Sequence, residues 1–123
     1  MESIMKRLVF LVLLASLVWS GCTKTEGTSA VYKGVVIYDI CGNVVVQSVG
    51  TDKIGQASWV DVNNAERPTY RHVFRVANPC QFGVHSFGDT ISFRIVAPQS
   101  QHCNQCQVSL VMPDTSYPIH VEN

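Results

Sequence analysis

The sequence predicts an all-β fold: a small barrel of five to six strands, with a small β-sandwich as the alternative. Short runs of β-branched and aromatic residues alternate with turn residues from position 31 to the end of the chain. No stretch in this region has the apolar spacing of a long helix. About six short strands separated by turn signals and without a convincing helix are typical of all-β barrels and sandwiches.

The first expected element is a β-hairpin. Residues 31–40 (VYKGVVIYDI) and 44–49 (VVVQSV) are rich in the residues that pack well on a pleated sheet. Between them lies Cys41-Gly42-Asn43, in which glycine and asparagine tolerate positive φ. Two such runs around a short turn containing glycine predict an antiparallel pair.

The segment 50–68 has a mixed pattern that leaves its structure open. Residues 58–62 (SWVDV) allow a short strand with Trp59 packed inward, and residues 63–67 (NNAER) allow a single helical turn. Residues 70–78 (YRHVFRVAN) alternate as a third main strand does. Proline at position 79 should end that strand, because it cannot donate a hydrogen bond to a neighbouring strand.

The last third of the sequence predicts three more strands. Residues 89–97 (DTISFRIVA) show the cleanest alternation in the chain, with Ile91 and Phe93 on one face. Residues 107–112 (QVSLVM) and 119–122 (IHVE) flank a turn of the type Pro-Asp-Thr-Ser. We expect these two segments to form a final hairpin.

This order of strands, together with Phe87-Gly88-Asp89-Thr90-Ile91-Ser92-Phe93, resembles the OB-fold, a five-stranded Greek-key barrel. The resemblance implies a ligand face on the strands, of the kind OB-folds use for oligosaccharides or oligonucleotides. The candidate ligand-binding residues on such a face are Tyr38, Phe74, Arg75 and Arg94. The alternative interpretation is that the aromatic residues of this set fill or cover the core.

The barrel resemblance also implies a disulfide pairing. If the third strand runs antiparallel to the second, its end lies beside the start of the second strand, which favours Cys41–Cys80. Cys103 and Cys106 would then lie at the opposite end of the barrel and pair locally as Cys103–Cys106. Four cysteines allow three pairings.

The segment His102-Cys103-Asn104-Gln105-Cys106 also allows a metal-binding or redox function. The three ligands would be His102, Cys103 and Cys106, since soft sulfur and imidazole ligands at this spacing suit zinc or copper. A redox pair of the thioredoxin type would need these cysteines at a helix N-terminus, whereas the pattern places them in a loop. The simpler interpretation is that these cysteines form a structural disulfide that fastens the loop, and we expect no cofactor.

The N-terminal region resembles the signal peptide of a bacterial lipoprotein. Lys6 and Arg7 precede an uncharged apolar run at 8–18, and Ser20-Gly21 leads into Cys22. The resemblance implies a signal peptide over 1–21, acylation of Cys22, a flexible tether over 22–30 and one β domain over 31–123. Trp19 stands where a lipobox usually has an aliphatic residue, and secretory cleavage after Ser20 is the alternative.

The number of cysteines favours lipidation, because the chain has five and acylation of Cys22 would leave an even number. Formal net charge is zero, which gives no electrostatic argument for a nucleic-acid partner. No nucleotide-binding or hydrolase motif stands out, so catalysis is not expected. We expect a lipid-anchored protein of the bacterial envelope with a binding or structural role and a glycan or envelope protein as partner. In a Gram-negative cell, Thr23 after the cysteine favours the outer membrane.

Overall fold

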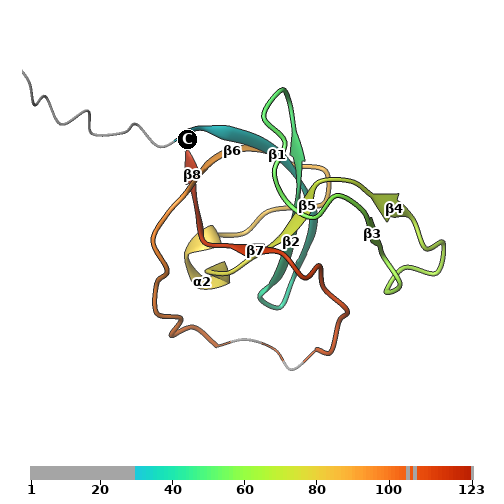
Figure 1. Ribbon diagram of the computed structural model, residues 1–123. Helices are drawn as coiled ribbons and strands as arrows, with labels where there is room; N and C mark the ends of the chain where they lie inside the picture. The colour runs from blue at the N-terminus through green and yellow to red at the C-terminus, as the bar shows by residue number, and fades with distance from the viewer. Residues whose placement is uncertain (1–29, 105, 107, 123) are drawn as a thin grey trace, which may run out of the picture.

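The computed structural model describes residues 30–104, 106 and 108–122, and its architecture is all-β, as the sequence predicts (Figure 1). The strands are β1 (Tyr32–Ile40), β2 (Asn43–Val49), β3 (Trp59–Val60), β4 (Thr69–Tyr70), β5 (Val73–Val76), β6 (Thr90–Ile95), β7 (Ser116–Tyr117) and β8 (Ile119–Glu122). One short helix, α2 (Pro79–Phe82), follows β5 within this part of the chain. The signal peptide, Cys22 and most of the tether expected from the sequence lie outside the described residues.

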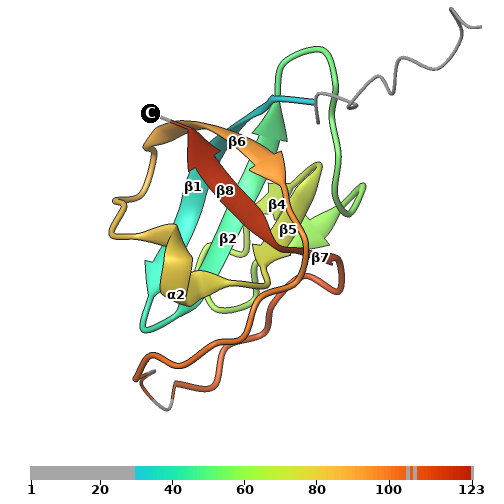
Figure 2. The same ribbon diagram turned by 90° about the vertical axis from the view of Figure 1, so that its left-hand side faces the viewer.

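Six strands form one sheet in the order β7-β5-β2-β1-β6-β8, and the sheet curls into a barrel (Figures 1 and 2). The predicted hairpin is confirmed, since β1 and β2 pair antiparallel around the turn at Cys41-Gly42. The third main strand, β5, pairs antiparallel with β2. A small all-β barrel is therefore the fold.

The two edges of the sheet are joined by one continuous stretch of chain. β7 pairs parallel with β5, and β8 pairs antiparallel with β6, with only Pro118 between them. Proline has no N–H to donate, so the ladder switches partners at this residue. Its carbonyl accepts a hydrogen bond from the amide of Val96 at 3.0 Å. Counting β7 and β8 as one kinked strand gives a barrel of five main strands.

A buried asparagine strengthens this closure. The side chain of Asn78, 1% exposed, donates to the carbonyl oxygen of Ile119 and accepts from its amide, both at 2.8 Å. A primary amide can satisfy a backbone N–H and C=O at once, as a neighbouring strand does. Asn78 therefore links the end of β5 to the start of β8 where regular pairing stops.

Two predictions about strands are wrong. Residues 108–112 of the predicted strand 107–112 form no strand, and the final hairpin is absent because β8 pairs with β6. The amide and carbonyl of Val111 bond instead to the side chain of Asn63, at 2.9 and 2.7 Å. The predicted strand 70–78 is interrupted at His72, whose φ is 56°. Both departures depend on contacts with residues distant in sequence.

The barrel interior is filled by one hydrophobic cluster. Its buried members are Val36, Val44, Val46, Phe74, Val76, Phe82, Ile91, Phe93 and Ile119. The strands approach each other closely at Gly34, where a Cβ would lie 2.5 Å from Cγ1 of Val46 and 3.1 Å from the ring of Phe93. Only glycine fits this crossing without a shift of its neighbours.

A second cluster lies on the outside of the barrel. β3 and β4 form a two-stranded arm (residues 56–70) that projects from the main sheet in Figure 1. Trp59 of this arm is 6% exposed, so the short strand that the sequence allowed is present and its tryptophan is buried. It joins Ile37, Val45 and Val73, whose side chains point away from the interior cluster. Part of the outer sheet face is therefore covered by the chain itself.

Candidate functional site

Two disulfides join three loops at one end of the barrel. Cys41, in the β1–β2 turn, pairs with Cys106, and Cys80, in α2, pairs with Cys103; the Cα–Cα distances are 4.9 and 5.6 Å. This connectivity overturns the predicted pairs Cys41–Cys80 and Cys103–Cys106. The long connection 96–115 is fastened at two points to the body of the barrel.

The prediction failed because it placed this connection at the wrong end of the barrel. It leaves β6 and swings back below α2 and the β1–β2 turn before it reaches β7 (Figure 2). About twenty residues of extended chain reach far enough for this return. Its cysteines therefore meet Cys41 and Cys80, while the antiparallel pairing of β2 with β5, on which the prediction also relied, is present.

The four candidate ligand-binding residues do not form one platform. Tyr38, Val45 and Arg75 lie in one row across β1, β2 and β5, and Arg75 is exposed. Phe74 points into the barrel with no exposed surface, so it belongs to the core. Arg94 lies on β6, where its Nε donates to Oε1 of Glu122 at 2.6 Å.

The outer face around Tyr38 is largely occupied by the arm. The ring of Tyr38 packs edge-on against Trp59, with centroids 6.3 Å apart, and Trp59 stacks on Tyr70 at 6.2 Å. Met112 from the long connection packs on the same cluster. The Asn63 side chain exchanges two hydrogen bonds with the backbone of Val111, which ties the arm to the long connection over this face. The aromatic residues here cover the sheet, as in the alternative interpretation of the sequence.

A buried carboxylate links the arm to β1. Asp61 is 1% exposed; its Oδ2 accepts a hydrogen bond from the Tyr38 hydroxyl, and its Oδ1 accepts one from the Asn63 amide at 3.1 Å. Burial raises the pKa of Tyr70, and the nearby negative charge of Asp61 adds to the rise. Both oxygens of Asp61 have structural partners, which makes it a positioning residue of the arm.

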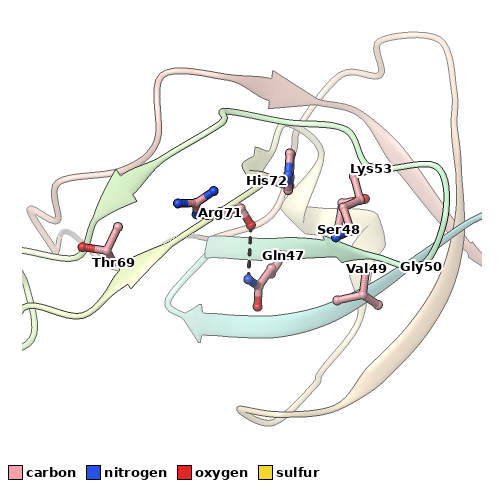
Figure 3. A pocket seen from close by; sticks show the side chains of 8 residues that line it. All are labelled: Gln47, Ser48, Val49, Gly50, Lys53, Thr69, Arg71 and His72. Carbon is pink, nitrogen blue, oxygen red and sulfur yellow. Dashed lines mark hydrogen bonds between the residues drawn. The ribbon is translucent and has the colours of Figure 1, made fainter.

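A polar surface site lies at the other end of β2, away from the disulfides. A pocket of about 540 Å³ is lined by Gln47, Ser48, Val49, Gly50, Lys53, Thr69, Arg71 and His72 (Figure 3). Its floor is the end of β2, and one wall is the link between β4 and β5. Three of its side chains are basic and none is acidic. Sequence reasoning missed this site because its walls come from separate segments with no common motif.

A smaller pocket of about 300 Å³ adjoins the first and shares Val49 and Gly50 with it. Tyr32 and Lys33 from the start of β1 line it, together with Asp52. Gly50 has a φ of 93°, and a Cβ built on it would meet nothing within 4 Å. The two pockets therefore meet at a turn where Gly50 leaves open space.

The residues proposed for a metal or redox site are not assembled for either role. Cys103 and Cys106 form disulfides with different partners, so neither supplies a thiolate. His102 is exposed in the long connection. In the described ranges, no three histidine, cysteine or acidic side chains come together as ligands for a metal ion.

Comparison of the chain with family models, curated proteins and solved structures gave no match. No helix in the described part of the structure is long and apolar enough to cross a membrane. The class that the fold and the site define is thus a disulfide-stapled small β-barrel with a basic surface pocket.

Proposed function

We propose that this chain is a small lipid-anchored protein of a bacterial envelope and acts there as a non-catalytic binding module. The anchor part of the proposal comes from the lipobox-like residues before Cys22. The pairing of the cysteines supports it. Four of the five cysteines are joined to one another in two disulfides, which leaves Cys22 for acylation. Disulfides of this kind are stable in an oxidising compartment such as the periplasm.

The single observation that carries the binding role is the pocket at the end of β2. It presents cationic and amide groups to solvent on a frame of paired strands. Asp61, by contrast, has a fully structural role, and the cysteines are bonded. A binding role therefore uses the cationic and amide groups of this pocket. The proposed partner is a glycan or another envelope component.

The competing function, metal binding or redox chemistry at Cys103 and Cys106, requires free thiols. The observed disulfides would have to be reduced and the long connection rearranged before these residues could serve as ligands. Thiol titration of the folded, unreduced protein separates the two functions, since two reactive thiols would favour the metal or redox role.

Intact-mass spectrometry of the protein extracted from its own membranes tests the anchored module. We expect the mass of a chain that begins at Cys22, increased by its acyl groups and lowered by four hydrogens for two disulfides. A chain cut after Ser20 without lipid would contradict the anchor. For the binding role, the same protein is immobilised and exposed to soluble envelope glycan and protein fractions, with reduced, unfolded protein as the control. Retention equal to that control would contradict binding.

A further inference from the structure

The pocket at the end of β2 is lined by basic side chains, although the pairing of the strands around it does not require them. Lys53 approaches from the loop after β2, and Arg71 and His72 come from the link between β4 and β5 (Figure 3). Lys53 and Arg71 make no ion pair with any other described residue. Like charges held around one hollow raise the local concentration of anions.

The backbone around this pocket is fixed by several contacts. His72 has a left-handed φ of 56°, and its carbonyl accepts a hydrogen bond from the amide of Ser48 at 2.7 Å. The side-chain nitrogen of Gln47 donates to the carbonyl of Arg71 at 3.2 Å, drawn as the dashed line in Figure 3. Left-handed backbone at a non-glycine residue is unfavourable, and such residues cluster at ligand sites. The backbone that carries the Arg71 and His72 side chains is thereby fixed beside the pocket.

Close packing on the other side of this link limits its movement. Gly55 lies so near that a Cβ on it would be 2.6 Å from the carbonyl oxygen of Val73 and 3.1 Å from the carbonyl carbon of His72. The amide of Gln56 also donates to the carbonyl of Val73 at 2.7 Å. A site held in advance loses less conformational entropy when a ligand binds.

The polar groups of the pocket match a ligand that combines an anion with hydroxyl groups. An arginine guanidinium binds phosphate or carboxylate through two parallel hydrogen bonds, and lysine adds a compact charge. The Gln47 amide and the Thr69 hydroxyl line the same space and offer further acceptors and donors. Beyond the turn at Gly50, Tyr32 lines the adjoining pocket, which leaves space for the sugar ring of such a ligand.

We propose that this pocket binds the anionic group of a hydroxylated ligand, a phosphorylated or carboxylated sugar, with Lys53 and Arg71 as its charge partners. This inference rests on the proposed binding role and names the ligand class for it. The phosphate chemistry has two sources, a saccharide or a lipid headgroup, and separate probes distinguish them.

The test uses isotope-labelled protein extracted from membranes into a neutral detergent and titrated with soluble probes, followed by amide NMR shifts. The probes are glucose 1-phosphate, glucuronate and glucose, with glycerophosphoglycerol as a deacylated lipid headgroup. We expect shifts at the amides of Gln47, Gly50 and Arg71 with an anionic probe, a Kd on the order of 1 mM, and weaker binding at high salt. Tighter binding of the sugar anions identifies a saccharide, and tighter binding of glycerophosphoglycerol identifies a headgroup.

Charge variants decide whether this pocket is responsible. Lys53→Gln and Arg71→Gln should each weaken binding of the anionic probe at least tenfold. The matched control, Arg67→Gln, removes the same charge from an exposed residue of the arm outside the pocket and should leave binding unchanged. Each variant must retain the dispersed amide spectrum of the parent, and Arg71→Lys provides a second variant that keeps the charge but not the paired hydrogen bonds.

Three results would overturn the inference: no pocket shifts with any anion, equal binding of glucose, or an equal loss in Arg67→Gln. None of them alone would refute the anchored binding module. A protein that is acylated and retains a neutral glycan or a protein partner would keep that function while losing this ligand class. A chain that is not acylated and retains no envelope fraction would refute the function itself.

Discussion

Removal of the Cys41–Cys106 disulfide by a double serine substitution should destabilise the barrel strongly. The bond spans 65 residues, and the Cys80–Cys103 bond, which spans 23, lies inside that loop and shortens it to roughly 40 residues. Loop-closure entropy then gives a loss of about 4 kcal/mol in the free energy of unfolding. Since small domains are stable by about 5–15 kcal/mol, the variant should unfold at markedly lower urea.

The assay is urea unfolding of the membrane-extracted protein, followed by tryptophan fluorescence, with thiol titration of the folded state. The control variant replaces Cys80 and Cys103 by serine, and it should lose about 3 kcal/mol because its loop is shorter. Neither variant should contain a reactive thiol when folded, since each removes a complete pair. A loss below about 1 kcal/mol for the first variant would refute the entropic argument. A non-reduced peptide joining Cys41 to Cys80 would refute the connectivity.

Three further predictions concern single side chains. Gly34→Ala should cost about 1–3 kcal/mol in urea unfolding, because the new methyl group meets Val46 at 2.5 Å; an unchanged midpoint would argue against the tight crossing. Asn78→Ala should cost about 2–3 kcal/mol because it leaves the buried amide and carbonyl of Ile119 unpaired, and a loss within 0.5 kcal/mol would contradict its role in closure. Burial raises the pKa of Tyr70, so the folded state keeps this proton longer than the unfolded state. Unfolding free energy should therefore fall as pH rises above about 10, and site-resolved titration should show that the Tyr70 hydroxyl ionises late; ionisation of Tyr70 at its ordinary pKa would contradict this.

Much of the fold could be predicted because it depends on local pattern. The hairpin of β1 and β2 follows from β-branched runs on either side of Gly42, and β6 follows from strict alternation around Phe93. In each case a residue's face is fixed by its neighbours two positions away, so sequence alone is informative. For Trp59 the sequence left the choice open, and the structure buries its ring in the second cluster.

Predictions failed where the outcome depends on distant partners. Residues 108–112 have strand-like composition, yet the side chain of Asn63 takes the hydrogen bonds of Val111 that a strand would use. Phe74 was a candidate for ligand stacking, but alternation alone cannot say which face of a strand points into a barrel. The basic pocket combines Lys53 with Arg71, which no short motif connects.

The sequence by itself determined the all-β class and the main hairpin. These follow from composition and short-range order, which a chain carries in any conformation. Only the tertiary structure decided the disulfide partners, the covering of the outer face by the arm, and the meeting of cationic side chains at the end of β2. The physical reason is that each of these requires the curled sheet and its long connection to bring together residues that are far apart along the chain.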